Sequence, residues 1–185
     1  MNAVEFVTRV IDALEKNVVE YMAVGSFSTN VYGKPRSTKD ADFVVELGDI
    51  PVSRIVSDIG PDFVLESQMS FETVTSTSRY RLHHRETKFL VELFMLSEDP
   101  HDRERFRRRV AGDIGGRRAF VPTAEDVVIT KLRWSRQGQR PKDLEDVRGV
   151  LKVQRGRLDL EYTRGWCDRH GTTTLLDQLL AEVPA

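Results

Sequence analysis

Residues 18–47 read VVEYMAVGSFSTNVYGKPRSTKDADFVVEL, and this stretch decides the fold. Its first part, VVEYMAVG, is a short apolar run that is rich in β-forming residues and ends on Gly25, which is typical of a buried strand. A short helix is expected from Ser26, followed by a loop and a second strand over 41–47. A strand, a glycine turn, a helix and another strand indicate an α/β (α+β) fold.

The rest of the chain extends this pattern. Apolar spacing predicts helices over 1–16 and 50–60, strands over 71–77, 78–86 and 87–96, a basic helix over 101–112 and a short strand over 117–121. From Pro122 onward the pattern is helical only. We therefore expect an α/β core over 1–121 and a helical region over 122–185 that packs on it.

Composition limits the classes of protein that fit. The chain has 185 residues, 39% of them hydrophobic and 31% charged, which is ordinary for a folded globular protein. A net charge of -1 gives no overall attraction to nucleic acid or to an anionic membrane. Cys167 is the single cysteine, so an intrachain disulfide and a Cys-rich metal site are excluded, and a reducing cytoplasm is expected. No apolar run approaches the roughly 18 residues of a membrane span, so no membrane partner is expected.

Two carboxylates open the second predicted strand. Asp40 and Asp42 are two residues apart, and on a strand such residues point to the same face. Adjacent carboxylates repel each other unless a cation lies between them, and oxygen ligands favour Mg²⁺ or Mn²⁺ over zinc. The pair alone is weak evidence for a metal site.

Gly25 and Ser26 stand at the turn between the first strand and the following helix. Backbone N–H groups and the positive end of a helix suit a phosphate at such a turn, and the serine hydroxyl can donate to a phosphate oxygen. The alternative is a helix N-cap serine that follows a turn glycine.

Glu92 lies inside the apolar run FLVELFML, residues 89–96. Its neighbours on the same face of a strand would be Leu90 and Phe94, so an unpaired carboxylate would be costly. Either this face opens onto a cleft where a cation binds, or Glu92 forms a salt bridge with an arginine on a neighbouring strand, such as Arg79 or Arg81.

These motifs together resemble the DNA polymerase β-like nucleotidyltransferase superfamily. The resemblance rests on Ala23-Val24-Gly25-Ser26, a spacer of thirteen residues, Asp40-Ala41-Asp42-Phe43, and a later single acid in Val91-Glu92-Leu93. The run Tyr32-Gly33-Lys34-Pro35-Arg36-Ser37-Thr38-Lys39-Asp40 is similar to small prokaryotic members, which include minimal nucleotidyltransferases and AbiEii-type toxins of toxin–antitoxin systems. The chain departs from the pattern in carrying Glu rather than the commoner Asp at the third acid.

The resemblance implies a mixed β-sheet core with flanking helices and a metal-dependent nucleotidyltransferase. A nucleoside triphosphate would donate its monophosphate to a hydroxyl acceptor, such as an RNA or tRNA end, a protein or a small molecule. It further implies that two divalent ions are held by Asp40, Asp42 and Glu92, which would be both metal-binding and catalytic. The residues implied to bind the nucleotide are Gly25, Ser26, Arg36, Thr38, Lys131 and Asp143.

Several of these assignments have simpler alternatives. Arg36 could pair with an acid in its loop, Lys131 could lie on a solvated helix face, and Asp143 could be an acid that favours a helix N-terminus. The basic residues over 103–109, with Arg117 and Arg118 nearby, could contact an RNA backbone or form a solvated helix face. For the whole chain, the alternatives to an enzyme are a non-catalytic binding or antitoxin partner with the same fold, and an RNA-binding module.

Overall fold

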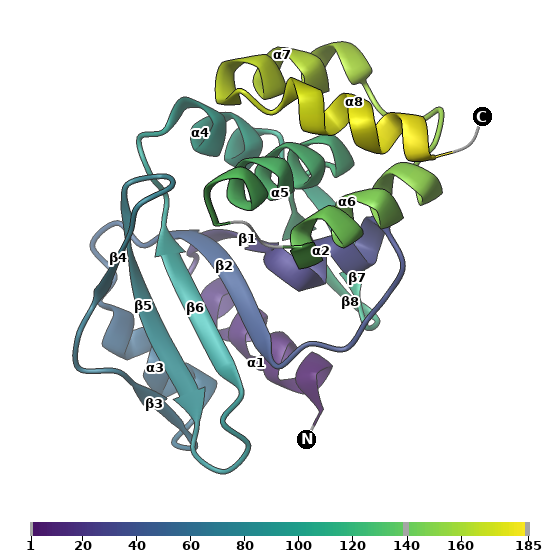
Figure 1. Cartoon of the computed structure of the whole chain (residues 1–185). Helices are drawn as coiled ribbons and strands as arrows, with labels where there is room; N and C mark the ends of the chain where they lie inside the picture. Colours follow the sequence, from purple (N-terminus) through teal and green to yellow (C-terminus); the bar gives the residue numbers. More distant parts are fainter. Residues whose placement is uncertain (1, 139–140, 184–185) are drawn as a thin grey trace.

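A computed structural model describes residues 2–138 and 141–183, and in this part of the chain six strands form one sheet. The strands are β1 (Glu20–Val24), β2 (Asp40–Glu46), β3 (Phe63–Leu65), β4 (Ser70–Glu72), β5 (Thr77–His84) and β6 (Leu90–Met95). Their order is β1-β2-β6-β5-β3, and β4 pairs with β5 outside this path. Strands β2 and β6 are parallel and the other pairs are antiparallel. The predicted mixed α/β architecture is confirmed (Figure 1).

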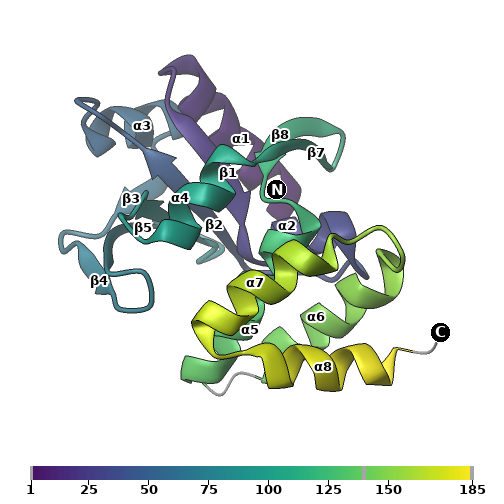
Figure 2. The same ribbon diagram turned by 90° about the horizontal axis from the view of Figure 1, so that it is seen from above.

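Helices α1 (Ala3–Lys16) and α3 (Val52–Ile59) cover one face of this sheet (Figure 2). Helix α1 begins with a capping box, in which the side chains of Asn2 and Glu5 each accept a hydrogen bond from the other residue's backbone at 3.0 Å. Its apolar side packs against the sheet, where Phe43 and Leu93 have no exposed surface. The main hydrophobic core therefore lies between α1, α3 and the sheet.

The structure describes six further helices. These are α2 (Gly25–Tyr32), α4 (Pro100–Arg107), α5 (Ala124–Gly138), α6 (Pro141–Val153), α7 (Leu160–His170) and α8 (Thr173–Glu182). A two-stranded hairpin of β7 (Val110–Ile114) and β8 (Arg117–Val121) leads into α5. The last four helices share a second hydrophobic cluster, centred on Ile129, Leu132 and Leu176. Within the described residues, no helix is long and apolar enough to cross a membrane.

Prediction and structure differ at three elements. The strand expected over 71–77 is interrupted after Glu72, because its carboxylate accepts hydrogen bonds from the N–H groups of Val74 and Thr75 and so caps a turn. The basic helix ends at Arg107 instead of reaching 112, and the following residues form β7. Strand β3 was not predicted, since three residues are too few to show a periodicity.

Two histidines join the core to the helical region. His101 of α4 lies 3.1 Å from the buried carboxylate of Asp126 in α5, and its ring centroid is 4.8 Å from that of Trp166 in α7. His170, at the end of α7, packs on the same tryptophan and is 5.2 Å from the His101 ring. Burial, followed by the charges of Arg133 and His101, lowers the pKa of His170 to about 4.

The lowered pKa of His170 gives a prediction for acid stability. The unfolded chain protonates His170 near pH 6.5, whereas the folded chain does so near pH 4, so stability is lost as the pH falls between these values. We expect His170→Gln to reduce the slope of unfolding free energy against pH in this window, by at most about 1.4 kcal/mol per pH unit. Urea unfolding between pH 4 and 7 measures the slope. An unchanged slope would contradict the assignment.

Candidate active site

Gly25 connects β1 to α2 at the edge of a cavity. Its backbone has φ +61°, a conformation that favours glycine. A Cβ atom at this position would lie 2.1 Å from the Asp42 Oδ2 atom. Two independent requirements therefore exclude a side chain here: the turn geometry and the close approach of the carboxylate.

Ser26 is the second residue of α2 and not its N-cap, so the alternative interpretation as a capping serine is wrong. The residue that precedes the helix is Val24, which supplies no capping hydrogen bond. The Ser26 hydroxyl instead accepts a hydrogen bond of 2.9 Å from the Arg36 guanidinium. The N–H groups of the first helical turn have no partner within the helix, so this turn can accept an anion.

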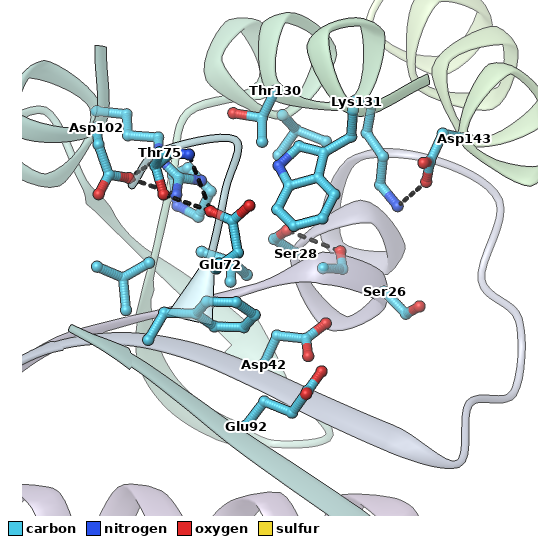
Figure 3. A pocket seen from close by; sticks show the side chains of 18 of the residues that line it. Ser26, Ser28, Asp42, Glu72, Thr75, Glu92, Asp102, Thr130, Lys131 and Asp143 are labelled. Carbon is cyan, nitrogen blue, oxygen red and sulfur yellow. Dashed lines mark hydrogen bonds and ion pairs between the residues drawn. The ribbon is translucent and has the colours of Figure 1, made fainter. Parts of the chain in front are cut away.

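The acids of β2 and β6 come together at the floor of the same cavity. In the parallel register Asp42 is opposite Glu92, and their carboxyl groups face each other (Figure 3). Asp40 also lines the cavity, but its carboxylate accepts a hydrogen bond from the Thr38 hydroxyl. Thr38, predicted to contact the nucleotide, is therefore placed as a partner of Asp40 and is not among the lining residues.

The donor chemistry of the three acids fits a divalent cation. All three offer carboxylate oxygens, the ligands that Mg²⁺ and Mn²⁺ prefer, and all three line one cavity. Among the described residues, however, no three His, Cys, Asp or Glu side chains are already arranged around a common point. Asp42 and Glu92 form the ready pair, and Asp40 would join them after leaving Thr38.

Glu92 also forms the salt bridges that the sequence offered as an alternative. Its Oε1 atom lies 3.1 Å from Arg79 and 3.2 Å from Arg81, both on the neighbouring strand β5. The carboxylate still lines the cavity beside Asp42. Glu92 therefore both faces the other acids and forms ion pairs, and the two arginines offset part of the negative charge of the three acids.

The cations at the opposite wall are held by two acids of α6. Lys131 of α5 lies 2.9 Å from both Asp143 and Asp146, and Arg36 forms two hydrogen bonds of 2.9 Å to Asp146. Lys131 points into the cavity and not toward solvent, so its alternative placement on a solvated face is wrong. Arg36 pairs with an acid of α6 instead of one in its own loop. Asp143 lies in the first turn of α6 as the alternative expected, and it also binds Lys131.

Asp42 has a pKa that is unusually high for an aspartate. Burial is the main cause, and the nearby charges of Glu92 and Asp40 add to it, so the pKa rises to about 7. Lys131 opposes this rise in pKa. Without a cation, the carboxyl group of Asp42 therefore keeps its proton to a higher pH than an ordinary aspartate does.

Sequence reasoning missed two lining or supporting residues. Asp146 anchors both Arg36 and Lys131, and Trp134 lines the cavity. Each lies three residues after a predicted site residue, Asp143 and Lys131 respectively. Residues three apart share a helix face, so this spacing could have identified both.

The arginines over 103–109 do not form a free basic patch. Each contacts an acid, and the pairs are Arg103 with Glu46 and Glu98, Arg105 with Asp102, Arg107 with Glu104, Arg108 with Asp126, and Arg109 with Glu20. Their positive charges are therefore largely balanced within the chain, which favours the alternative of a charged helix face over an RNA contact.

Comparison with known proteins identifies the architecture. No family model matches the chain, and no curated protein matches it in sequence. Among solved structures, the antibiotic-resistance factor ANT(2'')-Ia superposes with a TM-score of 0.62 over 95% of each chain, at 12% identity. JHP933 from Helicobacter pylori superposes with a TM-score of 0.54 at 16% identity over 98% of this chain and 82% of that one. The lincosamide antibiotic adenylyltransferase LnuA, bound to lincomycin, gives 0.56 at 14% identity over 80% and 96%.

The chain has the same fold as these proteins, a nucleotidyltransferase fold. The alignments span most of each chain, so the likeness includes the helical region as well as the sheet. Within the nucleotidyltransferase fold of this chain, the glycine turn, the β2 acids and the β6 acid lie around one cavity.

The double constraint on Gly25 predicts an unusually costly substitution. Gly25→Ala places a Cβ against Asp42, whereas Gly48 has a similar φ of +55° and open space within 4 Å of the point that a Cβ would occupy. Gly48→Ala should therefore cost about 1 kcal/mol for backbone strain alone. We expect Gly25→Ala to cost clearly more in urea unfolding. Equal costs would show that Asp42 does not constrain the turn.

The raised pKa of Asp42 predicts a stabilising substitution. Its folded pKa lies above the unfolded value of 3.8, so its contribution to stability is lost as the pH rises through about 7. At pH 8, in the presence of a chelator, Asp42→Asn should raise the unfolding free energy, because it removes a charge that the folded state disfavours. Each pH unit between the folded and unfolded pKa corresponds to about 1.4 kcal/mol.

Asp146→Asn is the matched comparison, because Arg36 and Lys131 lower the pKa of Asp146 against the effect of burial. Its contribution is present above the unfolded pKa, so this variant should be less stable at pH 8. Thermal unfolding at pH 5 and pH 8 shows whether each variant is more or less stable than the unchanged protein. Destabilisation by Asp42→Asn at pH 8 would contradict the proposed charge repulsion.

Proposed function

We propose that the protein transfers a nucleoside monophosphate from a nucleoside triphosphate to a hydroxyl acceptor, with a divalent cation and with release of pyrophosphate. The observation that carries this proposal is the placement of Asp42 opposite Glu92 in one cavity, beside the Gly25 turn and the cations Arg36 and Lys131. Phosphoryl-type transfer depends mainly on positioning and on neutralising charge, and this cavity offers groups suited to both.

The chain's residues divide into two groups in this proposal. The backbone of Gly25 and Ser26, at the positive end of α2, would hold the β- and γ-phosphates. Arg36 and Lys131 would neutralise them, and Asp146 fixes the positions of both cations. Asp143 holds Lys131 from the other side.

The three acids would act on the reacting atoms. The acceptor oxygen forms a bond to the α-phosphorus, and the bond from the α-phosphorus to the oxygen that bridges to the β-phosphorus breaks, so pyrophosphate leaves with that oxygen. Glu92 accepts the proton of the acceptor hydroxyl. Divalent cations held by Asp40, Asp42 and Glu92 would supply charge neutralisation at the triphosphate and beside the attacking hydroxyl.

The comparisons support the reaction class and suggest acceptors. ANT(2'')-Ia has been solved in complex with adenylyl-2''-tobramycin, and LnuA with lincomycin. A small hydroxyl compound is therefore one candidate acceptor for this protein, beside an RNA end or a protein. The toxin–antitoxin role and the cytoplasmic location stay predictions of the sequence.

Transfer of label from triphosphates tests the proposal. With α-labelled nucleoside triphosphates, Mg²⁺ or Mn²⁺ and a cell extract, we expect a labelled product, and we expect Asp42→Asn and Glu92→Gln to lower its formation by at least about a hundredfold. Glu66→Gln is the control, because Glu66 lies 3.4 Å from Arg81 and does not line the cavity.

Two results would overturn the enzyme proposal. One is the absence of any labelled product together with no thermal stabilisation by a triphosphate and Mg²⁺. The other is a product that Asp42→Asn forms as fast as the unchanged protein. Either result would favour the non-catalytic binding partner with the same fold.

A further inference from the structure

A second cavity adjoins the active site on the side away from α2. Its lining residues are Phe71, Glu72, Thr73, Val74, Arg79, Trp134, Gln137 and Gly138. We call this cavity the hairpin groove, because it lies between the β4–β5 hairpin and the end of α5. It shares Glu72, Arg79 and Trp134 with the cavity of the three acids, so the two are continuous.

We propose that the hairpin groove binds the acceptor, and that it selects a hydroxyl compound with a planar or apolar face and at most one positive charge. This inference rests on the proposed nucleotidyl transfer and names the acceptor class for it.

Sheet topology separates the two substrates. The order β1-β2-β6-β5 places the acids of β2 and β6 between α2, which follows β1, and the hairpin, which ends in β5. The triphosphate-binding groups Gly25, Ser26 and Arg36 all lie on the α2 side. The acceptor hydroxyl must approach the acids from another direction, and the hairpin groove is the described cavity that opens beside Glu92 on the β5 side.

Three apolar side chains line the hairpin groove. Phe71 is 63% exposed although it is a large aromatic residue, and Val74 and Trp134 line the same space. Exposed aromatic side chains that line a groove next to an active site are typical of ligand contact. A planar or apolar face of an acceptor would cover this surface.

The remaining charged side chains give the two cavities no net negative charge. Beyond the three acids and the triphosphate-binding residues, the charged side chains that line the two cavities are Glu72, Asp102, Arg79, Arg105 and Lys142. The two arginines balance the two acids and Lys142 adds one positive charge, so a compound with several positive charges gains no net attraction here.

Both of these acids already bind groups of the protein. The carboxylate of Glu72 accepts hydrogen bonds from the backbone N–H groups of Val74 and Thr75, and that of Asp102 accepts them from Ser97 and from the buried Arg105. Breaking such contacts to bind an amine would leave buried donors unsatisfied. An acceptor recognised through ammonium groups is therefore disfavoured.

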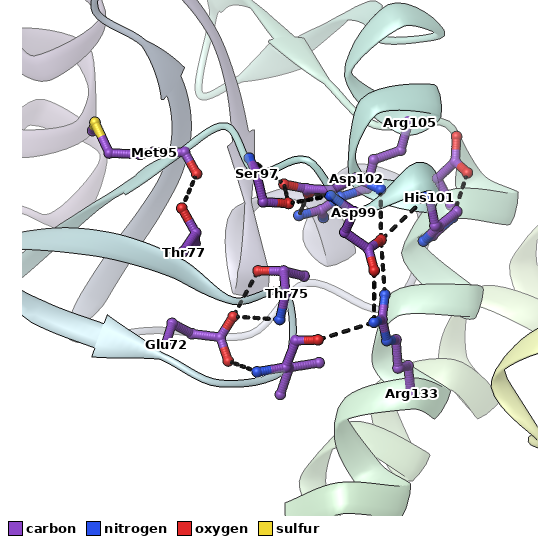
Figure 4. A network of polar contacts seen from close by, with 12 residues as sticks. Glu72, Thr75, Thr77, Met95, Ser97, Asp99, His101, Asp102, Arg105 and Arg133 are labelled. Carbon is purple, nitrogen blue, oxygen red and sulfur yellow. Dashed lines mark hydrogen bonds and ion pairs between the residues drawn. The ribbon is translucent and has the colours of Figure 1, made fainter.

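The wall formed by the hairpin is held in place from α5. The Arg133 guanidinium donates to the Val74 carbonyl at 2.9 Å and forms two hydrogen bonds to Asp99, at the start of α4 (Figure 4). Arg133 thus ties the hairpin to two helices. A groove with fixed walls favours a rigid acceptor, since less ordering is needed on binding.

Tryptophan fluorescence tests the groove directly. The chain has two tryptophans, and Trp166 packs on His101 and His170 away from the groove, so Trp166→Phe leaves Trp134 as the reporter. With the triphosphate site filled by a non-hydrolysable ATP analogue and Mg²⁺, we would titrate 4-nitrobenzyl alcohol, a planar neutral alcohol, and tobramycin, a polycation.

We expect saturable quenching of Trp134 by the alcohol and no saturable change with tobramycin. Phe71→Ser should weaken alcohol binding by about tenfold, the equivalent of one aromatic contact. Phe120→Ser is the matched control, because Phe120 is 43% exposed on β8, away from the groove. The inference is overturned if quenching by the alcohol is not saturable, if Phe71→Ser leaves it unchanged, or if tobramycin binds as tightly.

The result can be separated from that of the transfer assay. Saturable quenching that depends on Phe71, together with no labelled product from any triphosphate, would overturn nucleotidyl transfer and keep the groove as a binding site. Labelled product formed on polycationic acceptors only would overturn the acceptor class and keep nucleotidyl transfer.

Discussion

Strands β2 and β6 run parallel, and their register places the carboxyl groups of Asp42 and Glu92 side by side. Two acids at this distance repel each other unless a proton or a cation lies between them. The surrounding structure answers this repulsion in several ways. Arg79 and Arg81 contact Glu92 from β5, Lys131 favours the charged form of Asp42, and Asp42 still retains a proton up to about pH 7. The geometry therefore holds a site whose charge is balanced best when a cation enters.

The opposite wall of the cavity is built from charges that already have partners. Asp146 holds both Arg36 and Lys131, and Asp143 binds Lys131 as well. These cations are thus kept in fixed positions before any phosphate arrives. A triphosphate would add its oxygens to preformed contacts, so little side-chain ordering is left for the binding step.

The sequence predicted the part of the site that depends on local pattern. Strand alternation placed Asp40 and Asp42 on one face, and an acid within an apolar run marked Glu92. The pairing of β2 with β6, which joins these acids, arises from contacts between residues 50 apart in the chain, so no local signal reports it. For the same reason, the sequence could not show whether Glu92 faces a cleft or forms salt bridges with β5. The structure shows that it does both.

Short-range competition accounts for the errors in the elements. The side chain of Glu72 binds the backbone of the next residues and ends a strand that its composition would have continued. The residues after Arg107 form a hairpin with β8 because pairing with a second strand outweighs their helical composition. Trp134 was not predicted as a lining residue, since periodicity alone does not tell which apolar residues face a cavity.

Helix α5 determines what a truncated form of the protein would lose. Three of its residues serve different parts of the site. Lys131 lies at the cavity wall that would bind the triphosphate, Arg133 secures the hairpin, and Trp134 lines both cavities. A chain shortened before this helix would keep Asp40, Asp42, Glu92 and the glycine turn, yet it would lack the helices that close the cleft from above. Such a truncated protein would retain the reacting groups without the surfaces that align two substrates.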